Sequence, residues 1–525
     1  MGTEASRSRS IGIDLGTSNS CVASLDAGGQ PRILENRQSA RTTPSVVSYA
    51  PGGKLLVGAP AKRQMLTSPR DTIYAVKRLI GRRWDDPEIQ RLARTLPYAV
   101  VAADNGDAWV EAGGQRRSPQ EISAQVLDAC RQVAQEQLGS GLIDEAIITV
   151  PAHFDAAQRQ ATKDAAEIAG LRVRRLLNEP TAAALGYGVH KGAPARVAVC
   201  DLGGGTFDVS ILNSDGGVFE VIATHGDILL GGEDIDRRIV ERLADEIRHK
   251  HGIEVLSDPT LLGRVRDEAE RVKHVLSESA DARIEIPYLS MVGGKQVDFV
   301  RPITRAEVEG WVGDVIDRLG PPCKAALEQA GLTARDVDSM LLVGGMTRMP
   351  AVARKLEAIF GRKPARNANP DEAVAIGAAT QCAILDGLLT GVVLLDVTSR
   401  AIGVHAGGGR FAPVIPKNAT VPTRESRVMA TTADGQRELT IEVFEGENVD
   451  VRGNRPLGVF TLSGLPDGPA GEVVAMVDFT IDVDGILTVT GRELSTGVRT
   501  DVRLATACGL TRRDVRHLVQ GRPRM

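Results

Sequence analysis

Two segments of the chain combine glycine, hydroxyl and carboxylate side chains in a way that suits the binding of a phosphate chain. Each has an apolar run, the tripeptide Asp-Leu-Gly, a turn of small residues and a second apolar run, at residues 11–23 and 197–211. Glycine lets the backbone N–H groups of such a turn face an anion without an intervening Cβ, and hydroxyls add donors. The predicted cradles are formed by Gly16, Thr17 and Ser18 and by Gly203, Gly204, Gly205 and Thr206.

An aspartate ends the first apolar run of each segment, Asp14 in one and Asp201 in the other. Mg²⁺, which accompanies polyphosphates, prefers a few carboxylates together with retained waters, so we expect these two aspartates to hold it through waters. Either loop alone could equally be an ordinary tight turn that its aspartate caps. Because the plan occurs twice, phosphate binding is the better interpretation, and the repeat indicates two similar lobes that face each other.

A third glycine-rich segment, at residues 341–350, also places an apolar run before a turn. Gly344 and Gly345 would let the backbone approach a flat ligand closely, and Arg348 could stack its guanidinium on an adenine ring. Taken alone, the segment is better explained as a strand-to-helix turn with a surface arginine. Beside the two hairpins we interpret it as part of a nucleotide site, and the sequence has no GxxxxGK[ST] motif to indicate a P-loop enzyme.

The elements that must position these residues follow from hydrophobic periodicity. From about residue 11 to residue 389, apolar β-rich runs alternate with helical periods, which predicts an α/β fold. Ser118 and Asn369 are predicted N-caps, because each precedes a proline and has an acidic residue three positions later. Beyond residue 395 strict alternation replaces the helical periods, as at residues 438–443 and 477–489, and predicts an all-β sandwich.

The chain therefore divides into five predicted parts. They are a disordered N-terminus at 1–10, a two-lobed domain at 11–390 with a boundary near 195, a linker at 391–396, a sandwich at 397–507 and a short tail at 508–525. The apolar run at 391–396 could be a strand of the second domain or an interdomain linker that docks its side chains, and periodicity leaves both open. In the tail, Thr511 could begin a single helix that Gly521 and Pro523 would end, and we expect no long helical lid.

Composition excludes several classes of function. The 525 residues suffice for more than one domain, and 63 basic against 67 acidic residues leave no basic field for nucleic acid or anionic lipid. Apolar residues at 42% and charged residues at 25% are typical of a globular protein. The sequence has no apolar run of about eighteen residues and no paired-cysteine motif. We therefore expect a soluble protein of a reducing cytoplasm, with no nucleic-acid or membrane partner.

In combination, the motifs resemble those of the seventy-kilodalton heat-shock chaperones of the DnaK type, within the actin-like ATPase superfamily. The resemblance covers about residues 12–509 and is carried by IGIDLGTSNSCVA, YAVKRLIGRR, NEPTAAALGYG, DLGGGTFDVSIL, LLVGGMTRMP, NPDEAVAIGAA and VVLLDVT. It implies a two-lobed actin-like (ribonuclease H-like) α/β ATPase domain, a linker and an all-β sandwich that grips extended hydrophobic peptides. It also implies ATP hydrolysis, with ATP/ADP and Mg²⁺ as cofactors, in protein folding and the stress response.

The resemblance assigns catalytic roles to individual residues. Lys77 matches a catalytic lysine beside the γ-phosphate and the attacking water. Glu179 matches a carboxylate that relates the water site to lobe movement. Asp14 and Asp201 fall at the Mg²⁺ positions, and Thr206 belongs to the same catalytic set.

The resemblance also defines an adenosine side of the site. Its residues are Gly232, Glu233, Glu270, Lys273, His274, Ser277, Gly344, Gly345, Arg348 and Asp371. Without the resemblance, Glu270, Lys273 and Ser277 would be interpreted as neighbours on a solvated helix. His274 stands where the family often has an arginine.

The residues expected to couple the two domains are Pro151, Arg159, Arg175, Val392, Leu394, Leu395 and Asp396. Pro151 and Arg159 match residues that pass the nucleotide state to the linker, and the apolar linker residues would dock on the ATPase domain. Arg175 with Asp396 matches the region where J-domain co-chaperones act. The expected partners are unfolded or extended hydrophobic peptides, a J-domain co-chaperone and a nucleotide-exchange factor.

The sandwich departs from the family at its peptide site. Where the family has a methionine-containing arch over the channel, residues 406–411 read Ala-Gly-Gly-Gly-Arg-Phe, and Thr432 takes the place of the opposing residue, usually alanine. Losing apolar side chains there reduces contact with a bound peptide. The candidates for the peptide site are Phe411, Met429, Thr432, Leu439 and Ile441, although alternation alone would place three of these in the core.

We interpret the chain as an ATP-dependent chaperone in which hydrolysis is coupled to peptide grip through the linker. Two alternatives remain. The altered arch and short tail favour a nucleotide-gated scaffold or regulatory protein that holds one specific partner through the sandwich. The hairpin pair alone would suit an actin-like small-molecule kinase, such as a sugar kinase, but the linker and the sandwich argue against it.

Overall fold

The computed structural model describes residues 10–50, 52–139, 142–189, 192–292, 295–502 and 509–521. The predicted disordered N-terminus, apart from Ser10, lies outside these residues, as do Cys508 and Pro523 of the predicted tail. Within the described ranges, no helix is both long and apolar enough to cross a bilayer. The cysteines within them are free and buried, and they are Cys21, Cys130, Cys200, Cys323 and Cys382.

The first lobe is built on a mixed sheet with the strand order β12-β11-β1-β2-β3, and β4 pairs with β2. Its strands are β1 (Ser10–Asp14), β2 (Asn19–Leu25), β3 (Pro31–Ile33), β4 (Thr43–Pro44), β11 (Glu145–Val150) and β12 (Arg172–Asn178). β1 and β2 form the first predicted hairpin, with Ile13 opposite Val22. Every residue of β11 is buried, because the sheet is covered on both faces. The covering helices are α3 (Pro119–Leu138) and α4 (Ala156–Ile168) on one face and α12 (Ala373–Leu385) on the other.

Smaller elements extend the first lobe. Two antiparallel sheets contain β5 (Val47–Ala50), β6 (Lys54–Val57) and β7 (Thr72–Ile73), and β8 (Val100–Ala102), β9 (Ala108–Ala112) and β10 (Gln115–Arg117). The accompanying helices are α1 (Ala59–Gln64) and α2 (Pro87–Ala93), with the short turns η1 (Pro69–Asp71) and η2 (Val76–Arg78). Ala75, just before η2, has the left-handed φ of 54°. That conformation is costly for a residue with a Cβ, so the turn that carries Lys77 is strained.

The second lobe is built on a sheet with the strand order β18-β13-β14-β15-β19-β22. Its strands are β13 (Ala195–Leu202), β14 (Phe207–Asp215), β15 (Val218–Asp227), β18 (Ser339–Val343), β19 (Val393–Val397) and β22 (Thr420–Val421). β13 and β14 form the second predicted hairpin, and the predicted lobe boundary near residue 195 falls at the start of β13.

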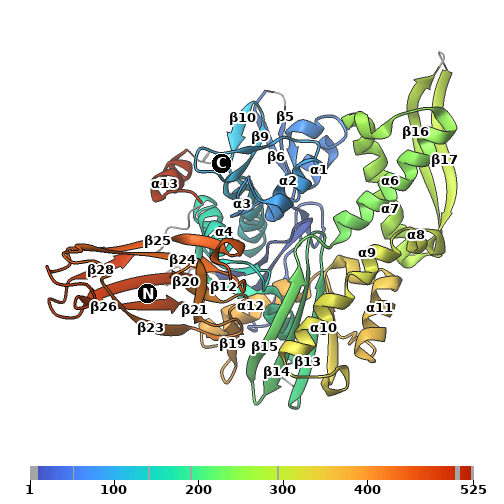
Figure 1. Ribbon diagram of the computed structural model, residues 1–525. Helices are drawn as coiled ribbons and strands as arrows, with labels where there is room; N and C mark the ends of the chain where they lie inside the picture. Colours follow the sequence, from blue (N-terminus) through green and yellow to red (C-terminus); the bar gives the residue numbers. More distant parts are fainter. Residues whose placement is uncertain are drawn as a thin grey trace, which may run out of the picture.

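Helices and a strand pair surround the sheet of the second lobe. They are α6 (Gly232–His251), η4 (Val255–Ser257), α7 (Pro259–Glu278), β16 (Asp281–Val292), β17 (Lys295–Thr304), α8 (Arg305–Trp311), α9 (Gly313–Asp317), α10 (Gly320–Gln329), η5 (Ala334–Asp336), η6 (Gly345–Arg348) and α11 (Pro350–Phe360). The antiparallel pair β16 and β17 lies far from the sandwich, at the opposite side of the molecule (Figure 1).

α12 and α5 (Glu179–Gly186) cross in close contact where the two lobes meet. Glycine makes the crossing possible: a Cβ on Gly377 would lie 1.7 Å from the Ala182 carbonyl oxygen. α12 also lies against β1, where a Cβ on Gly12 would lie 2.3 Å from the Ala379 nitrogen. These contacts leave no room for a side chain, so they fix the base of the cleft between the lobes.

The predicted sandwich consists of two four-stranded sheets with the orders β21-β20-β24-β25 and β23-β26-β27-β28. Its elements are β20 (Ile402–Ala406), β21 (Arg410–Ile415), β23 (Thr423–Ala430), β24 (Glu438–Glu445), η7 (Val451–Gly453), β25 (Arg455–Ser463), β26 (Val474–Ile481), β27 (Leu487–Glu493) and β28 (Arg499–Val502). Alternate residues of β24 and β26 are buried, as the pattern predicts, and the fully buried Phe460 and Phe479 fill the space between the sheets.

The apolar run at 391–396 forms most of β19, which pairs with strands on both sides of the predicted domain boundary. Val393, Leu394 and Leu395 pair with β15 of the second lobe, and Asp396 pairs with Val421 of β22, just before the sandwich strands. Leu394 is buried, Val392 and Leu395 are half-buried, and Val393 is 49% exposed. The run is therefore a strand that pairs with the second lobe, and it also leads into the sandwich. It has features of both interpretations, a strand and a docked connecting segment.

A single helix, α13 (Arg512–Gln520), follows the sandwich and lies against α4 of the first lobe (Figure 1). Thr511 caps it and Asp514 completes the capping box, so the predicted helix start is confirmed. Val515 is completely buried among residues of the first lobe, and Arg512 forms an ion pair with Glu167 at 2.9 Å. The chain thus returns from the sandwich to the first lobe.

One of the two predicted helix starts in the lobes is confirmed. The Ser118 hydroxyl accepts a hydrogen bond from the Glu121 N–H at 3.1 Å, directly before α3. At the other, α12 begins later than predicted, at Ala373, and Asn369 instead caps the turn before it, where its Oδ1 accepts from the Asp371 N–H at 3.2 Å and its carbonyl accepts from the Ala373 N–H at 2.9 Å. The Asp371 and Glu372 carboxylates of that turn pair with Arg348 and Arg41.

Candidate functional site

The two predicted cradles lie in direct contact at the base of a cleft between the lobes. A Cβ on Gly204 would lie 1.9 Å from the Ser18 hydroxyl oxygen, and one on Gly205 would lie 2.7 Å from Cγ2 of Thr17. Only glycine allows the loops to approach so closely. A cavity of about 810 Å³ opens above them, and both loops line it. The geometry therefore brings together two hairpins that lie far apart in the sequence.

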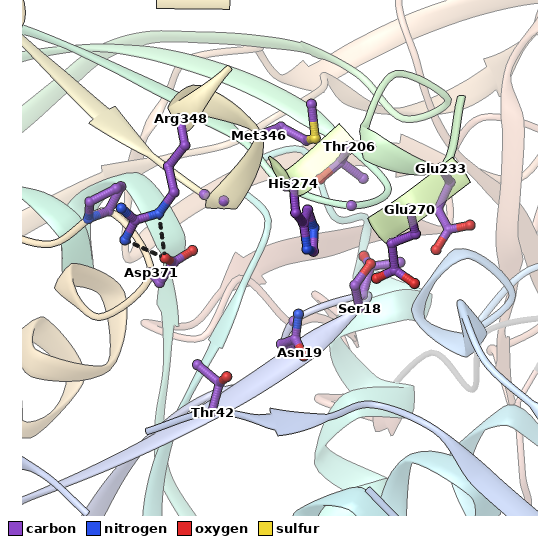
Figure 2. Close-up of a pocket in the computed structure, with 18 of the residues that line it drawn as sticks. Ser18, Asn19, Thr42, Thr206, Glu233, Glu270, His274, Met346, Arg348 and Asp371 are labelled. Atoms are coloured by element: carbon purple, nitrogen blue, oxygen red, sulfur yellow. Dashed lines mark hydrogen bonds and ion pairs between the residues drawn. The ribbon is translucent and has the colours of Figure 1, made fainter. Parts of the chain in front are cut away.

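Nearly every residue predicted for the site lines this cavity, the exception being Gly205. The Gly205 carbonyl instead accepts hydrogen bonds from the Arg78 guanidinium at 2.6 and 3.0 Å. Figure 2 shows His274 directed towards Asn19 and Thr42 of the first lobe across the open space. Arg348 and Asp371 lie together at one end, and Glu233 and Glu270 lie at the other.

One lysine and three carboxylates form the floor of the cleft. The Lys77 ammonium donates to Glu179 Oε1 at 2.5 Å, and both side chains are buried. Lys77 comes from η2 of the first lobe, and Glu179 is the first residue of α5. Asp14 is the last residue of β1, and Asp201 lies in β13. Both line the same cleft. This arrangement puts a cation and its acceptor beneath the place where both cradles meet.

The floor has more carboxylates than cations, and the pKa values of these carboxylates are raised. Burial and the neighbouring Glu179 charge raise the pKa of Asp14 to about 7. Burial, together with the surrounding carboxylates, raises the pKa of Asp201 well above its ordinary value, and burial also raises the pKa of Glu179. Gathering acids in this way is unfavourable unless a cation joins them.

The donor set fits a hard divalent cation such as Mg²⁺. Asp208, beside this cluster, has one buried carboxylate oxygen, Oδ2, with no hydrogen-bond partner among the described residues. Its other oxygen, Oδ1, lies 2.5 Å from His153 Nδ1. In the described part of the chain, no three His, Cys, Asp or Glu side chains are close enough to hold a metal between them. Oxygen donors that act partly through retained waters are what Mg²⁺ accepts.

The wall on the predicted adenosine side is pre-arranged by its own contacts. Lys273 donates to Asp236 at 2.7 Å, and Ser277 donates to the Lys273 carbonyl at 3.0 Å. Arg348 pairs with Asp371 at 2.6 Å. Burial, with the nearby Lys273 charge, lowers the pKa of His274, so its ring is a flat neutral surface at pH 7. Met346, which lines the same wall, was not predicted from the sequence.

Three contacts across the cleft were also missed by sequence reasoning. Arg78 of the first lobe pairs with Asp234 of α6 at 2.8 Å. Lys62 in α1 pairs with Glu270 in α7 at 2.8 Å, so the predicted adenosine-side glutamate also ties the lobes together. Arg266 of α7 pairs with Glu233 and stacks on Tyr74, with 4.0 Å between its guanidinium carbon and the ring centroid. Only Arg78 carried a signal, because it follows Lys77 in a quoted motif.

The first lobe and the sandwich meet at a joint centred on Arg159, which is buried. Its guanidinium donates to the carbonyl of Phe154 at 2.9 Å, to the Asn178 side chain at 2.8 Å and to the Asp484 carbonyl at 3.4 Å. The Asp484 carboxylate accepts from the Leu176 N–H at 2.8 Å and pairs with Lys163. The sandwich turn that contains Asp484 is therefore the element that contacts the first lobe at this joint.

Three further predicted coupling residues are Pro151, Asp396 and Arg175. Pro151 is buried at the end of β11. Asp396 accepts a hydrogen bond from the Thr181 hydroxyl at 2.7 Å, and no ion pair joins it to Arg175 among the described residues. Arg175 Nε is buried without a hydrogen-bond partner in that part of the chain. Asp396 thus contacts α5, and the role of Arg175 and Asp396 in co-chaperone action stays a prediction.

The structure does not bring the five peptide-site candidates to one surface. Leu439 and Ile441 are buried in the core of the sandwich, and Met429 packs partly buried against that core. Phe411 is half-buried with its ring over Gly403, and Thr432 is exposed. In this conformation Leu439 and Ile441 point between the two sheets, so their role as channel walls stays a prediction.

The sequence model of the Hsp70 protein family matches residues 10–524 of the chain. The matched range includes the hairpins of both lobes, β19, the sandwich and α13. One family pattern thus spans the cleft, the joint and the returning helix.

Proposed function

The chain belongs to the Hsp70 family, and from this premise we propose that it hydrolyses ATP in the interlobe cleft and couples hydrolysis to peptide binding by its sandwich. Members of this family are chaperones and ATPases that use ATP or ADP with Mg²⁺. The single observation that carries the proposal for this chain is the meeting of the two glycine loops above the Lys77–Glu179 pair. The proposed division places the ATPase in residues 11–390, the linker in 391–396, the sandwich in 397–507 and the tail in 508–525.

The backbone of the two loops would hold the phosphates, with the hydroxyls of Thr17, Ser18 and Thr206 as further donors. Asp14 and Asp201 would hold Mg²⁺ through waters, and the bound ion would neutralise charge on the phosphate oxygens. Lys77 would orient the attacking water and offset the charge that develops on the transferred phosphoryl group. Glu179 holds the Lys77 ammonium in place at 2.5 Å. Fixed charges in a buried site stabilise such a transition state without reorganisation.

The adenosine would lie against the turn that contains Gly344 and Gly345. A Cβ on Gly345 would lie 3.0 Å from Asp371 Oδ1, so the backbone there has close neighbours and a well-defined shape. Arg348, held by Asp371, and the neutral His274 ring are the proposed flat surfaces for the base. Lys273 and Ser277 would bind the ribose side from α7.

A short helix connects the cleft to the linker strand. Glu179 begins α5, and Thr181, two residues later, donates to Asp396 of β19. We propose that a change in the Lys77–Glu179 contact on hydrolysis moves the first turn of α5 and so loosens β19. A J-domain co-chaperone would act on the neighbouring surface near Arg175, and a nucleotide-exchange factor would act by opening the lobes.

The proposed ligands of the sandwich are extended hydrophobic peptides. The residues proposed for their contacts are Phe411, Met429, Thr432, Leu439 and Ile441, of which Leu439 and Ile441 would become accessible only if the two sheets separate. The glycine-rich arch offers less apolar area than a methionine would, so we expect weak binding and rapid release.

The deciding experiment measures release of a fluorescent leucine-rich heptapeptide from the full chain in excess ATP and in excess ADP. The proposal predicts that release is at least about tenfold faster with ATP than with ADP. Lys77→Ala should leave this difference intact, but it should abolish the hydrolysis that converts the ATP-bound state to the ADP-bound state. Lys324→Ala is the control, because Lys324 is 78% exposed on α10. Equal release rates in both nucleotides would contradict coupling and favour the scaffold alternative.

A further inference from the structure

A second cavity lies between the lobes, separated from the cleft by a thin wall. Its volume is about 320 Å³. Tyr74 of the first lobe and Glu233 and Arg266 of the second line both cavities, and the Arg266 guanidinium joins them by stacking on Tyr74 and pairing with Glu233. A ligand in the second cavity would therefore touch side chains that also face the nucleotide site.

The sides of the second cavity are apolar. Leu92 of α2, together with Leu96 and Pro97 in the turn after it, forms the first-lobe side. Leu229, Val240 and Leu262 form the second-lobe side. A concave site of this volume with apolar sides is suited to the body of a small molecule.

The charged residues of the two cavities are opposite in balance. Five arginines and two carboxylates line the second cavity, whereas eight carboxylates and six cations line the cleft. In the second cavity both carboxylates already have partners: Glu233 pairs with Arg266, and Asp234 pairs with Arg78 and accepts a hydrogen bond from Arg237 at 3.2 Å. The second cavity is therefore a basic site with an apolar interior.

Two of its arginines are available for a ligand. Arg91 is exposed, and its guanidinium makes one weak hydrogen bond, 3.4 Å from Nε to the Pro87 carbonyl, with no carboxylate partner in the described part of the chain. The Arg237 side chain is 49% exposed, and within the described ranges it contacts no carboxylate other than Asp234. Arg91 belongs to the first lobe and Arg237 to the second. An anion held by both would bridge the lobes.

We propose that this second cavity binds a small amphiphilic carboxylate, with its apolar body between the leucines and its carboxylate on Arg91 and Arg237. The planar guanidinium matches a carboxylate with two parallel hydrogen bonds. A monoanion fits better than a phosphate dianion, because Glu233 and Asp234 lie in the same lining. Because residues of both lobes contact the ligand, its binding is linked to lobe closure and slows nucleotide release, with equal and reciprocal effects on the two affinities.

The test is calorimetric titration of the full chain with octanoate, octan-1-ol, acetate and octyl phosphate. We expect saturable octanoate binding about tenfold tighter than that of octan-1-ol, no measurable acetate binding, and weaker binding of octyl phosphate than of octanoate. Equal affinity for octanoate and octan-1-ol would overturn the role of the arginines. Tighter binding of octyl phosphate would overturn the choice of a carboxylate. None of these measurements needs ATP hydrolysis, so they stand apart from the proposed function.

A pair of matched variants locates the site. Arg91→Gln should weaken octanoate binding about tenfold, whereas Arg94→Gln, exposed one turn further along and outside the lining, should leave it unchanged. Both side chains are exposed, so neither change should disturb folding. Octanoate should also slow release of a fluorescent ADP analogue severalfold from the wild type and not from Arg91→Gln. If Arg91→Gln binds octanoate as tightly as the wild type, the assignment is wrong.

Discussion

The interlobe cleft and the joint between the first lobe and the sandwich are both rich in buried charged groups, but they balance charge differently. In the cleft, Lys77 faces three carboxylates whose pKa values burial raises. In the joint, the Arg159 guanidinium has carbonyl and amide oxygens around it, and Asp484 has both a lysine and a backbone N–H. The first arrangement is incomplete without a further cation, whereas in the second Arg159 and Asp484 have partners within the protein.

Glu445 shows that a raised pKa alone does not identify a ligand site. It lies near Arg159 in the joint, where burial raises its pKa to about 7, and its Oε2 has no hydrogen-bond partner among the described residues. The cavity beside it has a volume of about 30 Å³, too small for more than water. What distinguishes the cleft is the combination of raised pKa values with open volume and converging backbone donors.

The largest effect should come from removing the cation of the cleft. Lys77→Ala should lower the single-turnover rate of ATP hydrolysis by about 10²–10³-fold, because the water and the developing charge lose their fixed ammonium. Nucleotide affinity should change far less, since the glycine loops remain. Rapid mixing with radiolabelled ATP gives the rate, and Lys324→Ala is the matched control. Hydrolysis at the wild-type rate in Lys77→Ala would place the chemistry elsewhere.

A smaller effect is expected at the joint. Asp484→Asn keeps an acceptor for the Leu176 N–H but loses the charge opposite Lys163. A hydrogen bond to a charged group contributes about 1.5–3 kcal/mol, so the joint should open at least about tenfold more often. Hydrogen exchange of peptides that contain Leu176 measures this opening.

The matched control for the joint is Asp467→Asn, which alters a carboxylate 71% exposed at the sandwich surface. It should leave exchange at Leu176 unchanged, and basal ATP hydrolysis should persist in both variants. Equal protection of Leu176 in Asp484→Asn and the wild type would show that the turn is held by shape rather than by charge. The distinction between a joint whose Arg159 and Asp484 are held by partners and an incomplete cleft would then fail.

The next prediction concerns the packing of the returning helix α13 on the first lobe, outside the joint. Val515→Ala removes two methyl groups from a completely buried side chain, which costs about 1–2 kcal/mol. We expect hydrogen exchange in α13 to accelerate about tenfold. Val519→Ala, at a residue 39% exposed on the same helix, should have little effect. Unchanged exchange in Val515→Ala would mean that capping and the Arg512 ion pair hold the helix alone.

The sequence predicted the local features of the site better than its cross-lobe contacts. The Asp-Leu-Gly hairpins and the Ser118 cap depend on neighbouring residues, and the structure has them where expected. Asn369 caps a turn rather than the first residue of α12, and the next two carboxylates pair with Arg348 and Arg41, which are distant in sequence. Local patterns do not reveal such tertiary pairs.

The same reason explains the missed residues. Lys62 and Arg266 lie on helix surfaces where a charged residue is ordinary. Their cross-lobe contacts, Lys62 with Glu270 and Arg266 with the Tyr74 ring, form only where the two lobes meet. Leu439 and Ile441 illustrate the converse, because alternation correctly placed them in the core while the family resemblance suggested a channel. The spacing of residues in the sequence does not reveal a role that depends on the conformation of the protein.

The smallest predicted effect is the release of protons when ADP and Mg²⁺ bind, and it reports most directly on the excess of carboxylates over cations in the cleft. With a pKa of about 7, Asp14 is about half protonated at pH 7 in the free chain. A cation bound beside it favours the ionised form, lowers this pKa and releases the proton. The affinity for ADP with Mg²⁺ should therefore rise with pH through the range around 7 and become constant well above it. Titration calorimetry in two buffers of different ionisation enthalpy should show net proton release at pH 7, less at pH 9, and less in Asp14→Asn at pH 7. Uptake of a proton, or the same release from Asp14→Asn, would mean that Asp14 is already ionised and that the cleft does not need a cation to balance it.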